Sequence, residues 1–414
     1  MTQPADAIGV FVREQTDAQT AFLAELVRIP SDNPPGDCTP AALRAADLIE
    51  KLGFVVERHE VPAELVKKVG MISVTNLIIR QRFGPLDAID GTTIALNAHG
   101  DVVPPGTGWT HDPYGAEVMD GWMYGRGAAV SKSDFATYLF ALMALKASGA
   151  ALKGSVEVHL TYDEESGGEI GPGLLLGQGI SKPDLALGAG FSYGVVNAHN
   201  GCLHLEVEVT GRSAHAAKPY TGIDALEAAN HVLTALYASR KSLAGHVSTF
   251  PGIGSPQLTI GLIEGGINTN VVPDRVVFRL DRRIIPDENA AIAEDMLRAV
   301  IATAAADFTD AKVAVRRILL AEPLTPLPGA GLLTERLCVH ASRIMGEEVT
   351  VGGVPLYTDA RHYAAHGVPI VLYGAGPHSI EEANAHRADE RLFLADLPKA
   401  TQVVALTLLD LLTV

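Results

Sequence analysis

The sequence predicts an α/β protein with a mainly parallel sheet, interrupted by an inserted ferredoxin-like α+β domain. Strand-like and helix-like runs alternate over the first two hundred residues, which is typical of parallel βαβ units. After Gly201 the pattern changes to strands with one polar face, and from about Leu324 the α/β pattern returns. We therefore expect a main domain in two parts, residues 1–202 and 318–414, and an inserted domain over 203–317.

In the main domain, apolar spacing distinguishes helices from strands. Phe135, Leu139 and Leu142 recur at helical spacing and indicate a core-facing helix, whereas Gly53 is expected to end an earlier one. The pattern predicts helices over 41–52 and 132–148, and strands over 54–58, 74–80, 93–96, 155–160 and 370–373.

In the inserted domain, the residues from Leu203 to Val209 alternate between apolar and polar, which indicates a strand with one solvated face. Asp224 and Glu227 resemble a capping box and predict the start of a helix that runs to Tyr237. Strands over 257–263 and 275–283 and a helix over 289–305 follow. This order is that of a β-α-β-β-α-β sandwich.

Composition excludes several classes of protein. The 414 residues are 47% hydrophobic and 19% charged, which indicates a globular chain with no membrane-spanning run or secretory signal. The net charge of −16 argues against nucleic acid or an anionic membrane as partner. Three widely spaced cysteines (Cys38, Cys202 and Cys338) are expected to be reduced thiols, which favours the cytoplasm.

Two short segments, 97–104 and 161–168, carry metal-ligating side chains directly after predicted strands. The first contains His99 and Asp101, and the second contains Glu164 and Glu165. Open α/β sheets bind ligands at the carboxyl edge of their strands, where these residues are expected to lie. Imidazole and carboxylate groups at that edge indicate a metal-assisted hydrolase.

The chain resembles the dinuclear zinc amidohydrolase family that includes succinyl-diaminopimelate desuccinylase, acetylornithine deacetylase, aminoacylase and the glutamate carboxypeptidases. The resemblance spans nearly the whole chain, and its motifs are specific because they occur together and in order. They are His99–Pro104, Gly125–Ala128, Asp163–Gly168, Ser213–Pro219, Asn268–Pro273, Asp281–Arg283, Thr358–Arg361 and Ala385–His386. It implies a catalytic domain with an inserted dimerisation or lid domain, and hence a homodimer.

The resemblance also implies roles for individual residues. His99, Glu165 and His386 match metal ligands, and Asp101 matches the carboxylate that orients the ring of His99. Glu164 matches the general base that activates water and returns the proton to the leaving amine.

Other positions match the substrate side of the family site. His215 matches a histidine that the partner subunit lends to the oxyanion. Arg283 and Asn270 match groups that bind a small substrate carrying a carboxylate, and Gly376 would allow a close backbone approach. Asp359 and Arg361 are as consistent with bracing the fold as with touching substrate.

Two ligand positions of the family differ in this chain. Val130 stands where relatives carry the aspartate that bridges two metals, and a second ligand position falls near Gly190. Asp134 is the only nearby replacement carboxylate. Two cations without a bridge would repel each other. We therefore expect one divalent ion, zinc first and manganese or cobalt as alternatives.

Three functions fit these residues. The first is a metal-dependent hydrolase of a C–N amide bond in a small N-acyl amino acid, dipeptide or related compound. The second is an isomerase or lyase that uses Glu164 as base on the same scaffold. The third is a non-catalytic homodimer that binds a small ligand, which gives no reason for Glu164.

Overall fold

The computed structural model describes residues 3–84 and 91–414. Contacts within the chain divide it into two compact units. Unit 1 comprises Met1–Asn197, Pro326–Val351 and Thr358–Val414, and unit 2 comprises Ala198–Thr325 and Gly352–Tyr357. The predicted fold class, an α/β domain with an inserted α+β domain, is confirmed. The part that residues 203–317 play in dimerisation stays a prediction.

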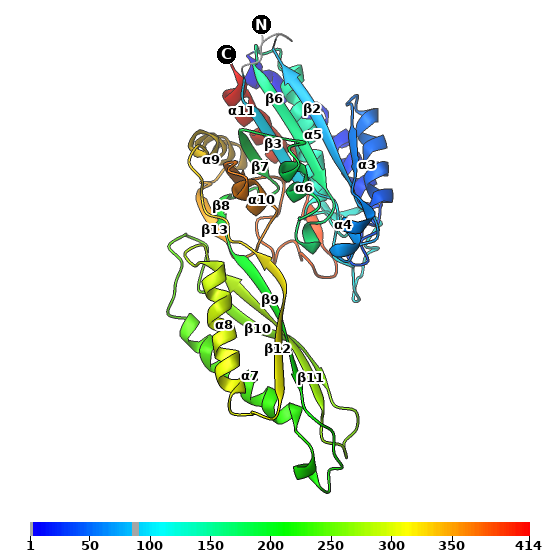
Figure 1. Cartoon of the computed structure of the whole chain (residues 1–414). Helices are drawn as coiled ribbons and strands as arrows, with labels where there is room; N and C mark the ends of the chain where they lie inside the picture. Colours follow the sequence, from blue (N-terminus) through cyan, green and yellow to red (C-terminus); the bar gives the residue numbers. More distant parts are fainter. Residues whose placement is uncertain (1–2, 85–90) are drawn as a thin grey trace. The chain divides into compact units, whose positions relative to one another are not determined.

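An eight-stranded mixed sheet, most of whose strands belong to unit 1, has the order β1-β2-β6-β3-β7-β14-β8-β13. β6, β3, β7 and β14 pair in parallel, whereas β1, β2 and β8 pair antiparallel with their neighbours. Figure 1 shows the long strands β2, β6 and β3 side by side. The strands are β1 (Glu57–Glu60), β2 (Thr75–Phe83), β3 (Thr93–His99), β6 (Gly154–Thr161), β7 (Leu185–Gly188), β8 (Val195–His199), β13 (Val351–Val354) and β14 (Ile370–Leu372).

Helix α5 (Lys132–Ala147) is the central helix of unit 1. It contacts β3 and β6 as well as α1, α2 and α11, and 13 of its 16 residues are buried. A helix that is enclosed on all sides needs apolar residues on all of its faces. This explains why the apolar residues of α5 are not confined to one face. The other helices are α1 (Pro4–Glu14), α2 (Thr16–Val27), α3 (Thr39–Lys51), α4 (Ala63–Lys68), α6 (Pro172–Gly177), α9 (Gly331–Met345), α10 (Ala360–Ala365) and α11 (Asp396–Leu412).

A small three-stranded sheet, in the order β15-β5-β4, completes unit 1. It consists of β4 (Glu117–Met119), β5 (Trp122–Tyr124) and β15 (Arg391–Phe393). This sheet joins the segment before α5 to the segment before α11, which are distant in sequence.

One predicted strand of unit 1 is displaced. Residues 54–58 alternate in burial, with Phe54 and Val56 buried and Val55 exposed, as in a strand. Pairing with β2, however, begins only at Glu57. Alternation was a sound indicator of burial there, but a strand also needs a hydrogen-bonded neighbour.

Unit 2 has a four-stranded antiparallel sheet in the order β10-β11-β9-β12, which is the ferredoxin-like arrangement. Its strands are β9 (Gly201–Thr210), β10 (Gln257–Gly265), β11 (Arg275–Ile284) and β12 (Lys312–Ala321). Helices α7 (Ala225–Leu243) and α8 (Ala290–Ala305) contact each other and the sheet. Asp224 caps α7 by accepting from the backbone N–H groups of Leu226 and Glu227. The predicted helix start is therefore confirmed, although α7 runs beyond Tyr237.

Within residues 3–84 and 91–414, no helix combines the length and the apolar character that crossing a membrane requires.

Candidate functional site

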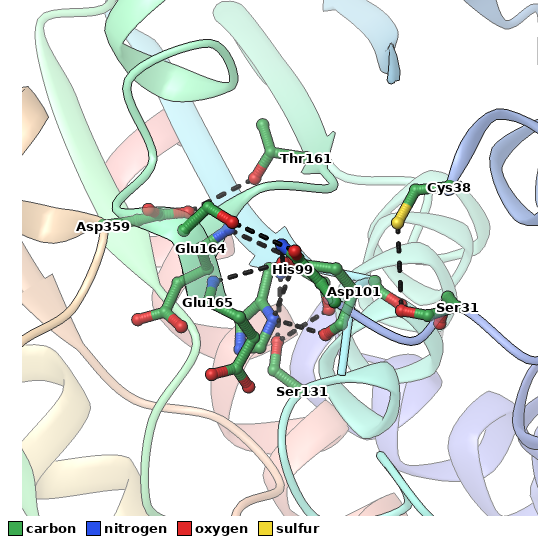
Figure 2. Close-up of polar contacts among 12 residues, drawn as sticks. Ser31, Cys38, His99, Asp101, Ser131, Thr161, Glu164, Glu165 and Asp359 are labelled. Atoms are coloured by element: carbon green, nitrogen blue, oxygen red, sulfur yellow. Dashed lines mark hydrogen bonds and ion pairs between the residues drawn. The ribbon is translucent and has the colours of Figure 1, made fainter. Parts of the chain in front are cut away.

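The two polar segments singled out in the sequence meet at one edge of the unit 1 sheet. β3 and β6 are parallel neighbours, and their last residues, His99 and Thr161, lie opposite each other. The loop after β3 carries Asp101, and the 3-10 turn η1 (Glu164–Ser166) follows β6. Figure 2 shows His99, Asp101, Glu164 and Glu165 gathered at this place.

Asp101 holds the two segments together. Its side chain is fully buried. Its Oδ1 accepts from the backbone N–H of Glu164 at 3.2 Å, and its Oδ2 accepts from that of Glu165 at 3.1 Å. Oδ2 also accepts from Asn33 Nδ2 at 2.9 Å. One carboxylate therefore fixes the backbone of both glutamates relative to the end of β3.

The ring of His99 is oriented by the same residue. His99 Nδ1 donates to the carbonyl oxygen of Asp101 at 2.9 Å and lies 3.4 Å from Asp101 Oδ1. This leaves Nε2 for another partner, which is the arrangement of a metal-binding histidine. Burial alone would lower the pKa of His99, but the hydrogen bond to Asp101 and the charges of Glu164 and Glu165 raise it well above its usual value.

The ligand atoms of His99, Glu164 and Glu165 lie within 4.8 Å of one another. A fourth predicted residue, His386, has its Nε2 3.4 Å from Glu165 Oε1. Imidazole nitrogens and carboxylate oxygens are the donors that zinc and similar ions bind. The residues present therefore offer suitable donors for a divalent ion; that His99, Glu165 and His386 hold it, and that only one ion binds, stay predictions.

Glu164 occupies an environment that favours its neutral form. Burial raises the pKa of this carboxyl well above its usual value, and the charges of Glu165, Asp359 and Asp101 add to the effect. His99 acts in the opposite direction. A carboxyl poised in this way can take up a proton and return it, as a general acid–base group must.

The structure places a different contact at each of the two altered ligand positions. The backbone N–H of Val130 donates to Glu390 Oε1 at 3.4 Å, and that of Gly190 donates to Asp134 Oδ2 at 3.3 Å. Val130 has no ligand atom in its side chain, and neither has Gly190. The donor set described above therefore lacks the bridging group of a two-metal site.

Asp134, the candidate replacement ligand, is engaged with backbone. It lies on α5, is buried, and accepts from the N–H groups of Gly190 and Ala375. A Cβ at Gly374 would lie only 2.0 Å from its Oδ1, so glycine is required there. Burial raises the pKa of Asp134 to about 7. These contacts give Asp134 a structural part; its role as a metal ligand stays a prediction.

Asp359 and Arg361 brace the turn that carries the glutamates. Thr161 Oγ1 donates to Asp359 Oδ2 at 3.3 Å, and Arg361 Nη2 donates to the carbonyl oxygen of Gly167. Gly168 has φ +70°, and a Cβ on it would lie 2.2 Å from Asp359 Oδ1. The Gly-Gly pair after the glutamates thus allows both the turn and the close approach of Asp359.

Three contributors to the site escaped the sequence analysis. Asn33 contacts Asp101, Ser131 Oγ accepts from the backbone N–H of His99 at 3.1 Å, and Glu390 binds the 125–130 loop. Each lies at least 30 residues from its partner. No local pattern marks such residues, because only the tertiary fold brings them to the site.

Three predicted site residues belong to unit 2. His215 and Asn270 are exposed and lie on adjacent segments, joined by a hydrogen bond from the N–H of Ala216 to the carbonyl oxygen of Asn270. Arg283 Nε donates to Asp281 Oδ1 at 2.9 Å, the strand-end ion pair that its sequence also allows. Their roles toward substrate stay predictions.

Gly376 is buried and its backbone is fully engaged. Its N–H donates to Gly190, and its carbonyl oxygen accepts from Ser192 Oγ at 2.8 Å. A Cβ there would lie 2.4 Å from the carbonyl oxygen of Gly190. Glycine is therefore required for the contact with Gly190; the approach to substrate stays a prediction.

The fold is an α/β unit with an inserted ferredoxin-like unit, and a His-Asp-Glu-Glu cluster lies at the carboxyl edge of its sheet. This combination is typical of metal-dependent amide hydrolases. The sequence profile of peptidase family M20/M25/M40 matches residues 95–410. Because this match covers most of the 414 residues, the chain belongs to that family.

Comparisons with individual proteins agree with this family membership. The chain is 28% identical over 357 residues to an acetylornithine deacetylase of Proteus mirabilis, and the alignment covers 84% of each protein. Among solved structures it resembles human carnosine dipeptidase 1, with a TM-score of 0.78, 18% identity and 99% of each chain covered. It also resembles a dinuclear metal binding peptidase of Bacillus subtilis, with a TM-score of 0.66, 16% identity, and 96% and 99% coverage of the two chains.

Proposed function

We propose that this protein hydrolyses the C–N amide bond of a small N-acyl amino acid or dipeptide that carries a free carboxylate, with one divalent ion per active site. The observation that carries the proposal is the convergence of His99, Glu164 and Glu165, held by Asp101. The substrate class is supported by relatives named for the deacetylation of acetylornithine and for the cleavage of the dipeptide carnosine.

Zinc is the expected ion, with manganese or cobalt as alternatives, and His99, Glu165 and His386 would hold it. When bound, such an ion supplies a Lewis acid that polarises the scissile carbonyl and lowers the pKa of water. Asp101 supports this role because its contacts at Nδ1 fix the tautomer of His99 and leave Nε2 as the nitrogen that can bind an ion.

Glu164 acts as the general base in this proposal. Its partner Glu165 contacts His386, which leaves Glu164 the carboxylate available for proton transfer. Glu164 takes a proton from the attacking water and then delivers it to the leaving amine nitrogen. Its raised pKa supports the second step, because it favours the protonated carboxyl that must donate to the amine.

The substrate side of the proposal rests on three residues of the inserted domain and on Gly376 of unit 1. Arg283 and Asn270 would bind the substrate carboxylate and neighbouring polar atoms, with Gly376 close to the substrate backbone. His215 of the partner subunit would donate to the oxyanion, which makes the active form a homodimer.

A second function is favoured by one observation. Val130 and Gly190 remove two carboxylates of a two-metal site while Glu164 stays in place. An isomerase or lyase that uses Glu164 to abstract an acidic C–H proton would account for both.

The test combines metal content with turnover. We expect the purified chain to bind an ion that is lost in His99→Ala, and to release free amine from N-acyl amino acids or dipeptides. A chelator should abolish this release, and zinc should restore it. Glu164→Gln should abolish turnover while substrate still binds.

Other results would redirect the assignment. Isomerised or eliminated product without amine release would establish the second function. Metal content unchanged by His99→Ala would refute the proposed ion site.

A further inference from the structure

A second group of metal-ligating side chains lies in unit 2, outside the site described above. Cys202, His204 and Asp281 offer ligand atoms that lie within 4.8 Å of one another. Cys202 and His204 are two residues apart on β9, so they point to the same face of the sheet. Asp281 on β11 is the direct cross-strand partner of His204.

This face of the sheet is the one opposite the helices. Leu203 and Leu205 alternate with the two ligand residues and are fully buried in the core that includes α7 and α8. The side chain of His204 is 36% exposed and that of Asp281 is 27% exposed, whereas Cys202 is buried. The imidazole and the carboxylate of this group are therefore partly accessible to solvent, whereas the thiol is enclosed.

The distances describe a compact triangle. His204 Nε2 lies 3.0 Å from Asp281 Oδ2 and 3.2 Å from Cys202 Sγ, and Sγ lies 3.7 Å from the same oxygen. A tetrahedral zinc ion with bonds of about 2.0 to 2.3 Å separates its ligand atoms by about 3.3 to 3.8 Å. The triangle is thus close to one face of a zinc tetrahedron, and only small side-chain shifts would complete it.

The geometry does not suit a nucleophilic thiol triad. In such a triad one ring nitrogen of histidine faces the nucleophile and the other faces the carboxylate. Here the thiol and the carboxylate both face Nε2 of His204. Convergence of the thiol and the carboxylate on one nitrogen does not fit a proton relay, and it is compatible with a shared cation.

We propose that Cys202, His204 and Asp281 form a zinc site in the inserted domain, with solvent as the fourth ligand. A thiolate, an imidazole and a carboxylate are a donor set that zinc prefers, and zinc binding deprotonates the thiol. Asp281 would bind the ion through Oδ2 and keep Oδ1 for Arg283, which donates to it at 2.9 Å. The ion would therefore also fix the position of Arg283.

The thiolate gives this site a signature that the unit 1 cluster lacks. The ligands proposed for the unit 1 cluster, His99, Glu165 and His386, contain no sulfur. Burial raises the pKa of Cys38 and of Cys338, and neither joins a group of metal-ligating side chains among residues 3–84 and 91–414. A metal–thiolate signal would consequently report Cys202.

The experiment is cobalt substitution of the metal-free full-length protein. Cobalt bound to a thiolate produces a charge-transfer absorption band in the near ultraviolet, which nitrogen and oxygen ligands do not give. We expect this band in the wild-type protein and in His99→Ala. We expect its loss in Cys202→Ser and its retention in Cys338→Ser, the matched control. Zinc should displace the cobalt and abolish the band.

Metal counting gives a second readout. Cys202→Ser should hold one zinc ion fewer per chain than the wild type, and so should His204→Gln, provided that circular dichroism shows each variant folded. No band at saturating cobalt, or a band unchanged in Cys202→Ser, would overturn the proposal. The hydrolase assignment is tested separately, because His99→Ala should lose turnover and keep the band.

Discussion

Arg126 and Glu390 form a buried ion pair, with Arg126 Nη1 2.6 Å from Glu390 Oε2. Glu390 Oε1 accepts in addition from the N–H groups of Gly127 and Ala129. The guanidinium also lies 5.3 Å from the ring centroid of Trp109. The carboxylate thus fixes the loop that leads to Val130 and α5, and the arginine of the Gly-Arg-Gly-Ala motif compensates its buried charge.

Breaking this pair should destabilise unit 1. In Arg126→Met the carboxylate of Glu390 loses its counter-charge inside the protein, which typically costs about 3–5 kcal/mol. Urea unfolding measures the loss. The control is Arg58→Met, which breaks a solvent-exposed pair with Glu50 and should cost far less stability. Equal losses in the two variants would contradict the structural role of Glu390.

Much of the fold could be predicted because local patterns reflect burial. The alternation of β9 and the capping of α7 by Asp224 are local features, and both occur as expected. Helices α1, α2 and α11 were not predicted. α2 and α11 are apolar on several faces because they pack against other helices, so a one-sided stripe is a poor guide to them.

The candidate site could be predicted only where its residues stand in motifs. His99 is the last residue of β3, and Glu164 and Glu165 follow the end of β6. The parallel pairing of these two strands brings the three residues together. Asn33 and Glu390 stand in no comparable motif and contact the site across long sequence separations. The sequence also suggested Asp134 as a spare ligand, whereas its oxygens accept backbone N–H groups.

Restoring a carboxylate at the altered bridging position should change metal stoichiometry. Val130→Asp supplies the anionic group that two neighbouring cations need between them. The comparison uses Cys202→Ser, which lacks the proposed zinc site of unit 2. We expect the double variant Val130→Asp/Cys202→Ser to bind one more ion per chain than Cys202→Ser alone. Val130→Asn, similar in size but uncharged, is the control. Unchanged metal content after Val130→Asp would show that position 130 does not face the ion.

Asp101 should control metal affinity through His99. Asp101→Asn removes the negative charge beside Nδ1 of His99 and one acceptor of the two glutamate N–H groups. Loss of such supporting carboxylates typically weakens metal binding by about 10 to 100-fold. Competition with a chromophoric chelator measures the change, with the exposed Asp17→Asn as control. Equal affinities in the two variants would refute the orienting role.

His215 should affect turnover much more than binding. The side chain is exposed, so His215→Ala should leave thermal unfolding unchanged. Removing one oxyanion donor typically lowers kcat by about 100 to 1,000-fold. Steady-state kinetics and the affinity for a non-hydrolysable substrate analogue separate the two effects. Lys218→Ala, in the same exposed segment, is the control. A loss of affinity as large as the loss of kcat would contradict the oxyanion role.

His362 should make unit 1 sensitive to acid. Burial, together with the charge of Arg361, lowers the pKa of His362 to about 3, although its Nε2 donates to the carbonyl oxygen of Gly167 at 2.8 Å. Between this pKa and the unfolded value of 6.5, the unfolded chain binds more protons than the folded one. The contribution of neutral His362 to the free energy of unfolding is therefore fully present above pH 6.5. It decreases as the pH is lowered, by about 2 kcal/mol at pH 5.

The variant His362→Gln isolates this contribution. Glutamine does not titrate and can still donate an N–H to Gly167, so its free energy of unfolding should fall less between pH 7 and pH 5. The decrease in the free energy of unfolding from pH 7 to pH 5 should be about 2 kcal/mol smaller in the variant than in the wild type. Urea unfolding at both pH values measures it. The exposed His246→Gln is the control and should follow the wild type. A pH dependence of His362→Gln equal to that of the wild type would show that folding does not lower the pKa of His362.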